Sequence, residues 1–327
     1  MATKINIQLF CFLLIFVSIL HICMGVKPIA FSIIIESIFK FDPFNFDHQI
    51  IISLRIPRLL AAIVSGASLG LAGAALQAIT NNPLASPGIT GMTSGAALFI
   101  VVSSLFISNE ALTLYFPYLA ALGAFLTFMA VIHISGFNRR IYTINKFTIV
   151  GITISAFISA VTAMILILSQ DTFDALRLWL VGNLSGTKLP DVTLALLPVC
   201  FGGVLILSLI KQFNTLALGD LVAKNLGINT NRHFLVVSIA CAFLISGSII
   251  CAGPIGFIGL MAPHLAKLIN GTEYKWIFPL SMLIGSILLV VADILAVVLL
   301  SPTELATGLI VGLVGSPFFV YLVKRYI

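Results

Sequence analysis

The chain has 327 residues, of which 60% are hydrophobic and 9% are charged, and its mean hydropathy is +1.18. Soluble globular proteins carry about 25% charged residues, so this composition excludes soluble enzymes, nucleic-acid-binding proteins and disordered tails. The net charge of +6 is interpreted as a signal of membrane topology, because the chain is predicted to cross the bilayer many times.

Ten apolar runs along the chain predict membrane-spanning helices, since about 20 apolar residues cross roughly 30 Å of hydrocarbon. The runs are continuous rather than alternating, which favours helices over strands and predicts an all-α fold. We interpret the first run as an uncleaved helix, because it is long and no small-residue cleavage motif follows it. The runs are 7–26, 56–78, 88–108, 116–136, 147–168, 192–210, 234–252, 255–269, 276–298 and 306–324.

The Lys and Arg residues between these runs are unequally divided. Ten spans place both termini on one side, and most of the basic residues gather on that side, whereas most of the acidic residues lie on the other. By the positive-inside rule, both termini are predicted to be cytoplasmic. Two shorter apolar segments, 28–40 and 174–184, are predicted to lie at the outer membrane surface without spanning it.

The second span opens at the outer face with the sequence Arg55-Ile56-Pro57-Arg58. Proline suits the first turn of a helix, so the span is expected to begin there. The two arginines either extend to lipid headgroups or present their guanidinium groups to carboxylates of an external partner. Both interpretations remain open at this point.

Small residues recur at helical spacing in the second and tenth spans. Such stripes let helix backbones approach closely in lipid. For each stripe, we favour the interpretation that it packs against other helices of the same chain over the interpretation that it forms an interface with another subunit. The stripes are Gly66, Gly70 and Gly73 in the second span, and Gly308, Gly312 and Gly315 in the tenth.

Two connections on the predicted cytoplasmic side have distinctive sequences. The segment 81–88 contains two prolines and two asparagines, which predict a rigid turn that either is ordinary or narrows a pathway. In the longer connection 211–233, Asp220 is predicted to N-cap a short helix over 221–226, and Gly227 suits the left-handed position that ends it. This short helix is either a docking element or a loop without a partner.

Residues that could carry chemistry are few. Asp293 is the only carboxylate deep in a span, and such groups are usually functional, although the sequence names no basic partner for it. The segment 182–188 resembles a phosphate-binding loop but has the wrong spacing, so nucleotide chemistry requires another chain. The five cysteines form no C-x-x-C pair, and no disulfide, metal site or catalytic residue is predicted.

Four ordered segments resemble the permease subunits of ABC importers for iron-siderophores, haem and vitamin B12, and ferric-citrate and siderophore permeases in particular. The likeness extends from about residue 30 to the C-terminus. The segments are RIPRLLAAIVSGASLGLAGAALQAITNNPLASPGITGMTSGAAL (55–98), LALGDLVAKNLGI (216–228), AGPIGFIGLMAPHLAK (252–267) and ELATGLIVGLVGSPFFVYLVKR (304–325).

The resemblance implies one permease domain, 1–327, in the cytoplasmic (inner) membrane, with a cytoplasmic coupling loop at 211–233. The implied partners are a second permease subunit, identical or related, two ATP-binding subunits, a periplasmic or lipoprotein substrate-binding protein and membrane lipid, and no nucleic acid. ATP and Mg would bind to the partner subunits, so this chain would carry no cofactor and would not be an enzyme. Its implied cargo is a ferric siderophore or ferric citrate.

The resemblance also implies roles for individual positions. Arg55 and Arg58 match outer arginines that receive glutamates of the binding protein. A cytoplasmic gate is implied at Asn82, Leu84, Ile144 and Asn145. Contacts with the ATP-binding subunit are implied for Leu218, Gly219, Asp220, Ala223, Leu226 and Gly227. Leu221 stands where the family usually has an acidic residue, and Val297 where some members have an arginine.

Three alternatives stay open. The first is a haem or cobalamin permease of the same family. The second is a secondary carrier driven by an ion gradient, for which several carboxylates in the spans would be expected and only Asp293 is found. The third is a membrane scaffold that transports nothing.

Overall fold

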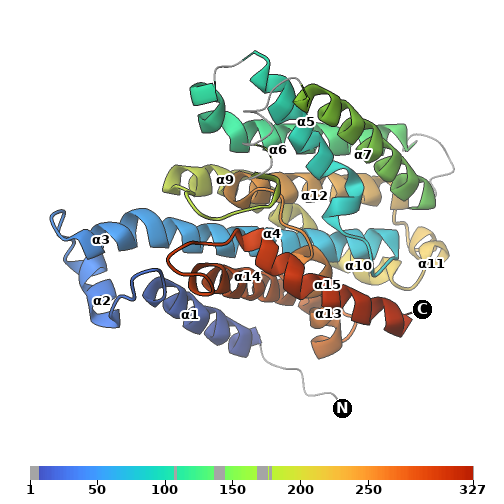
Figure 1. Ribbon diagram of the computed structural model, residues 1–327. Coiled ribbons are helices and arrows are strands. Elements are labelled where there is room, and N and C mark those ends of the chain that lie inside the picture. The colour runs from blue at the N-terminus through green and yellow to red at the C-terminus, as the bar shows by residue number, and fades with distance from the viewer. Residues whose placement is uncertain (1–6, 107–108, 136–143, 168–175, 177–178, 327) are drawn as a thin grey trace.

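The computed structural model describes residues 7–106, 109–135, 144–167, 176 and 179–326, and within these ranges the fold is helical without strands (Figure 1). Each of the ten predicted apolar runs coincides with a helix, so the all-α prediction is confirmed. These helices are α1 (Ile7–Cys23), α4 (Ile56–Thr80), α5 (Met92–Ser104), α6 (Asn109–Ile134), α7 (Ile144–Leu166), α9 (Leu189–Ser208), α12 (Thr230–Ala252), α13 (Ile258–Asn270), α14 (Tyr274–Val298) and α15 (Thr307–Tyr326).

Six of these helices are long and apolar enough to cross a membrane by length and composition, and α1, α5 and α15 are shorter apolar helices among the described residues. The run predicted at 88–108 yields the shorter α5, because a 3-10 turn at Pro87–Thr90 takes up its first residues. The end of α15 lies at the end of the bundle that carries α10 (Ile210–Leu216) and α11 (Asp220–Asn225), and α1 has its start on the side toward this end (Figure 1). Which side of a membrane this end faces stays a prediction.

The second predicted span begins earlier than expected. A short helix, α3 (Phe46–Ile50), continues through a π-helical turn at Ile51–Arg55 into α4, so that one helix extends from Phe46 to Thr80. The prediction that Pro57 opens the helix is therefore wrong. Proline lacks the N–H that an interior helical residue donates, and the wider π-helical turn directly before it accommodates this missing bond. Asn45 caps the true start, where its side chain accepts a hydrogen bond from the backbone N–H of Asp47.

The segment 28–40 forms a short helix, as predicted, and it does not span. This helix, α2 (Phe31–Phe39), lies with α3 at the opposite end of the bundle from α10 and α11 (Figure 1). Its Ile34 and Ser37 are buried, whereas Phe31 and Phe39 are exposed. The segment 174–184 lies mostly outside the described residues.

Helix α4 is the centre of the bundle, where it packs against α12, α13 and α14. The backbones touch at its glycines: a Cβ at Gly66 would overlap the backbone of Gly285, one at Gly70 that of Ser281, and one at Gly73 that of Gly259. The preference for packing within the subunit is confirmed for this stripe. In the α15 stripe, a Cβ at Gly308 would overlap the backbone of Val181 and one at Gly315 the side chain of Phe257, whereas one at Gly312 would meet no atom within 4 Å.

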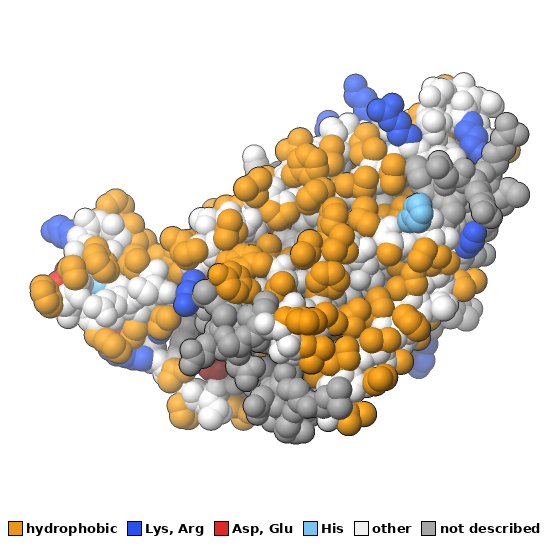
Figure 2. All heavy atoms as spheres, turned by 90° about the horizontal axis from the view of Figure 1, so that it is seen from above, with side chains coloured by type: hydrophobic (Ala, Val, Ile, Leu, Met, Phe, Trp, Pro, Cys, Tyr) orange, Lys and Arg blue, Asp and Glu red, His pale blue; other side chains and the backbone are white. Residues whose placement is uncertain are grey.

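The periphery is apolar, as expected for a surface that faces lipid. The face seen from above Figure 1 is covered mainly by hydrophobic side chains, with its cationic side chains near the rim of the view (Figure 2). Helix α7 is the most exposed of the long apolar helices among the described residues. Only 11% of its most apolar 18-residue stretch is buried, and the side chains of Ile149, Phe157 and Met164 are exposed.

Candidate functional sites

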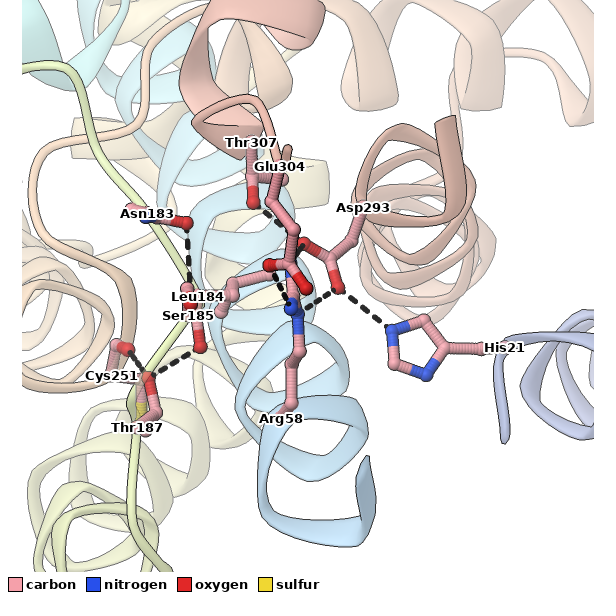
Figure 3. A network of polar contacts seen from close by, with 10 residues as sticks. All are labelled: His21, Arg58, Asn183, Leu184, Ser185, Thr187, Cys251, Asp293, Glu304 and Thr307. Atoms are coloured by element: carbon pink, nitrogen blue, oxygen red, sulfur yellow. Dashed lines mark hydrogen bonds and ion pairs between the residues drawn. The ribbon is translucent and has the colours of Figure 1, made fainter. Parts of the chain in front are cut away.

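A buried ion pair joins α4 to α14 near the end of the bundle where α2 and α3 lie. The Arg58 side chain donates through Nε to Oδ2 of Asp293 at 2.7 Å and through Nη2 to Oδ1 at 3.0 Å (Figure 3). The Asp293 carboxylate is fully buried, and the Arg58 side chain is 13% exposed. Two parallel bonds between these planar groups fix the orientation of the guanidinium as well as its position.

The same carboxylate binds two further helices. His21 of α1 lies with Nε2 2.8 Å from Oδ2 of Asp293, and Thr307, the first residue of α15, donates through Oγ1 to Oδ1 at 2.6 Å (Figure 3). Asp293 therefore connects α1, α4, α14 and α15. A carboxylate at this depth is tolerated because each of its oxygens accepts two hydrogen bonds.

A second carboxylate reaches Arg58 from the surface. Glu304 lies in the connection between α14 and α15, and its Oε2 accepts a hydrogen bond from Nη1 of Arg58 at 2.7 Å. Its side chain is 31% exposed, so exposure rises from Asp293 through Arg58 to Glu304. Asp293 stands out in the sequence as a carboxylate within an apolar run, but none of these partners can be recognised from the sequence.

Arg55 has a different environment one helical turn away. Its guanidinium donates to the backbone carbonyls of Ile22, Cys23 and Lys27, where α1 ends and the chain turns toward α2. Helix C-termini leave carbonyl groups without intrahelical partners, and Arg55 satisfies two of them and a third just beyond. Both arginines predicted to dock a binding protein are therefore engaged within the chain in this conformation, and their docking role stays a prediction.

The predicted cytoplasmic gate comprises a turn and the start of a helix. Asn81 ends α4 in the left-handed conformation, and the side chain of Asn82 accepts a hydrogen bond from the backbone N–H of Leu84 at 2.9 Å. Asn82 lines a small pocket with Phe147 and Thr148 of α7, so this turn lies beside the first turns of that helix. Ile144 and Asn145 open α7, but their side chains lie outside the described residues.

The predicted coupling loop contains two short helices, α10 and α11. Asp220 is the first residue of α11, and Gly219 takes the capping position, so the predicted boundary is wrong by one residue. Gly227 has a φ of 83°, the left-handed conformation predicted for it. Exposed leucines dominate this surface, because Leu218 is 69%, Leu221 79% and Leu226 66% exposed.

The loop is tied to the spanning helices by polar contacts. Gln212 of α10 lies 2.8 Å from Nδ1 of His233 in α12, and Asn214 accepts a hydrogen bond from the backbone N–H of Tyr274 at the start of α14. Ala223 is fully buried, so it supports α11 from beneath and does not present a contact surface. The predicted coupling loop is therefore hydrogen-bonded to both α12 and α14.

Two cavities lie between the helices. One of about 350 Å³ is lined by Phe116, Trp179 and Asp191 together with the 249–253 segment. The other, of about 240 Å³, lies between the 86–93 segment and the 253–257 connection, and its lining includes Met92, Ser248 and Phe257. Neither cavity adjoins the Arg58–Asp293 pair.

Comparison with known proteins gives concordant matches over nearly the whole chain. The model of the FecCD transport family matches residues 13–325. The Fe(3+) dicitrate transport system permease protein FecC of Escherichia coli (strain K12) is 39% identical over 274 residues, covering 84% of this chain and 82% of that protein. The probable siderophore transport system permease protein YfiZ of Bacillus subtilis (strain 168) is 35% identical over 320 residues, covering 95% and 94%.

A solved structure has the same fold. It is described as an inward-facing conformation of a metal-chelate type ABC transporter, and it superposes with a TM-score of 0.84 at 26% sequence identity. The alignment covers 97% of this chain and 98% of that one.

Proposed function

The chain belongs to the FecCD transport family, and we propose that it is the permease subunit of an ATP-driven importer that carries an iron chelate across the cytoplasmic membrane. The family match over residues 13–325 carries this proposal. The names of the relatives support the cargo, since FecC is described as an Fe(3+) dicitrate permease and YfiZ as a probable siderophore permease. We therefore propose ferric citrate or a ferric siderophore as the class of cargo.

An ATP-driven importer needs a subunit that hydrolyses ATP, so this permease needs an ATP-binding partner. We propose that an ATP-binding subunit docks against the exposed leucines around α11, namely Leu218, Leu221 and Leu226, with Gly219 and Gly227 shaping the connections on either side. Exposed leucines on a short helix are an interaction surface that a soluble partner can cover. This chain then performs no bond chemistry, because ATP and Mg bind to the partner subunit.

Transport itself is a shift between two access states. Closure of the ATP-binding subunits would bias the permease toward one state through the coupling loop. We propose that the 81–86 turn, with Asn82 and Leu84, and the start of α7, with Ile144 and Asn145, narrow the cytoplasmic end of the path between this subunit and a second permease. Asn82 and the first turns of α7 line one small pocket, which supports this pairing.

On the outer side, we propose that Arg58 receives a carboxylate of a substrate-binding protein. The orientation imposed by Asp293 supports this role, because a fixed guanidinium recognises a carboxylate at a lower entropic cost. Arg55 lies one turn further out, but its three bonds to backbone carbonyls would have to open before it could dock a partner.

Reconstitution tests the proposal. The chain is assembled in proteoliposomes with its cognate permease, ATPase and binding protein, and uptake of radiolabelled ferric citrate, a ferric hydroxamate, haem and cobalamin is compared. We expect uptake of an iron chelate only with ATP, and none with a hydrolysis-deficient ATPase. Uptake driven by a proton gradient with that inactive ATPase would instead establish a secondary carrier. Preference for haem or cobalamin would change the cargo but not the mechanism.

A further inference from the structure

The guanidinium of Arg58 is divided between an inner and an outer carboxylate. Nε and Nη2 are occupied by Asp293, which is fully buried, and Nη1 alone is directed toward Glu304 (Figure 3). Of the two carboxylates, only Glu304 has access to solvent, with 31% of its side chain exposed. The inner bonds therefore hold Arg58 in place, whereas the outer bond is the one that water or another anion can replace.

The backbone around Glu304 is anchored independently of its side chain. The N–H of Leu305 donates to the carbonyl of Ala296 in α14 at 3.0 Å, and the N–H of Gly308 donates to the carbonyl of Gly182 at 3.0 Å. Thr307 binds Asp293 through its own hydroxyl. Because these bonds persist when the Glu304 carboxylate moves away, its release requires a rotamer change and leaves α15 in place.

The charges at this position oppose a third carboxylate. Arg58 contributes one positive charge, and Asp293 and Glu304 contribute two negative charges, while His21 beside Asp293 adds a positive charge only when it is protonated. With a neutral His21, an approaching carboxylate is repelled while Glu304 remains. When the Glu304 side chain turns to solvent, the approaching carboxylate instead meets a guanidinium whose Nη1 is free to donate a hydrogen bond. The internal carboxylate and the external one therefore compete for Nη1.

We infer that Glu304 is an internal competitor that occupies Arg58 until a carboxylate of the substrate-binding protein displaces it, so that Glu304 weakens docking and favours release of that protein. This inference rests on the proposed function, since it concerns the outer docking step of an importer. It identifies Glu304 as a residue that sets the strength of docking, together with the atom, Nη1 of Arg58, over which the two carboxylates compete.

The test measures docking affinity. The complete transporter is placed in nanodiscs, and binding of the solute-binding protein encoded beside it is followed by biolayer interferometry at low and at physiological salt. Glu304→Gln is expected to tighten binding about three- to tenfold, because an exposed or partly exposed charge pair contributes on the order of 1 kcal/mol. Glu304→Asp, which keeps the charge but shortens its reach, is expected to tighten binding by less.

Two comparisons show whether the effect acts through Arg58. Glu36→Gln removes an exposed carboxylate on α2 at the same end of the bundle and is expected to leave affinity within twofold. In a background in which Arg58→Met and Asp293→Leu remove the buried pair together, so that no buried charge is left unpaired, Glu304→Gln is expected to have no further effect. Unchanged or weaker docking of both Glu304 variants, or tightening that persists without Arg58, would overturn the inference.

Uptake by the unaltered transporter shows whether a failed test counts against this inference or against the proposed function. If ATP-driven uptake of every iron chelate fails, the proposed function is wrong. If uptake proceeds but the Glu304 variants dock as the unaltered protein does, only the competition is wrong.

Discussion

Arg58 and Asp293 are 235 positions apart in the chain, and two hydrogen bonds join them inside the bundle. Each residue makes the burial of the other tolerable, because an isolated charge in a low-dielectric environment is costly. The pair thus holds α4 and α14 in register at the end of the bundle that carries α2 and α3. It also explains why the only carboxylate deep in a span does not indicate a proton-coupled carrier, since its charge is compensated within the structure.

Removing the inner carboxylate should destabilise the protein strongly. Asp293→Asn leaves the Arg58 guanidinium with Glu304 as its one carboxylate, and loss of the charge-assisted bonds to Asp293 should lower the free energy of unfolding by about 1.5–3 kcal/mol. Denaturant unfolding of the purified subunit in mixed micelles measures this loss. Asp47→Asn, which breaks the more exposed ion pair with Lys27, should cost less than about 1 kcal/mol.

A compensating double variant shows whether the loss comes from the unpaired charge. Arg58→Met combined with Asp293→Leu should recover most of the stability lost in Asp293→Asn, since a buried ion pair can be replaced by apolar side chains at little cost. If Asp293→Asn alone leaves the free energy of unfolding unchanged, the ion pair does not have the structural role given to it here.

Gly73 in α4 and Gly312 in α15 should respond differently to alanine. Gly73→Ala places a methyl group against the backbone of Gly259, so α4 and α13 must separate, at a cost of about 1–3 kcal/mol. Gly312→Ala adds a methyl group where no atom lies within 4 Å, and alanine favours the helix by up to about 1 kcal/mol. Thermal unfolding of both variants distinguishes them, and equal melting temperatures would contradict the close packing of α4.

Arg55 should matter for the position of α1. Arg55→Gln removes bonds to the carbonyls of Ile22, Cys23 and Lys27. The Cys23 carbonyl keeps the N–H of Ile29 as a donor, whereas losing the guanidinium at the other two carbonyls costs about 1–3 kcal/mol. Increased hydrogen exchange at the end of α1 and throughout α2 is the expected local signature. Lys27→Gln serves as a control, because the exposed Lys27 ammonium contributes only a surface ion pair. Unaltered exchange in Arg55→Gln would show that α1 is held by other contacts.

The exposed surface of α11 should be required for energy coupling but not for folding. Leu221→Asp introduces a charge on a side chain that is 79% exposed, so the melting temperature should not change. Because a central apolar contact contributes more than about 1 kcal/mol to an interface, affinity for the ATP-binding subunit should fall about tenfold or more. Co-purification with that subunit measures the effect. Glu273→Gln, at an exposed position before α14, should co-purify normally.

The positions of the helices could be predicted from the sequence because apolar runs of sufficient length have few alternatives in lipid. The left-handed conformation at Gly227 and the turn at Asn82 could also be predicted, because both depend on residues that are only a few positions away in the chain. The partners of Asp293 could not be predicted, because they come from α1, α4 and α15 and depend on how the helices pack. For the same reason, the stripes in α4 and α15 look alike in sequence, although only α4 uses all three glycines to touch neighbouring backbones.

The close contact of α4 with α13 and α14 has a consequence for the transport cycle. Backbones that touch at Gly66, Gly70 and Gly73 cannot slide without overlapping, so these three helices form a rigid frame. The moving parts of the cycle should therefore be sought at the rim, and first in α7, which is the least enclosed of the long apolar helices. The distance between a spectroscopic label on α7 and one on α14 should change during the transport cycle. The distance between two labels that are both on the frame should stay constant.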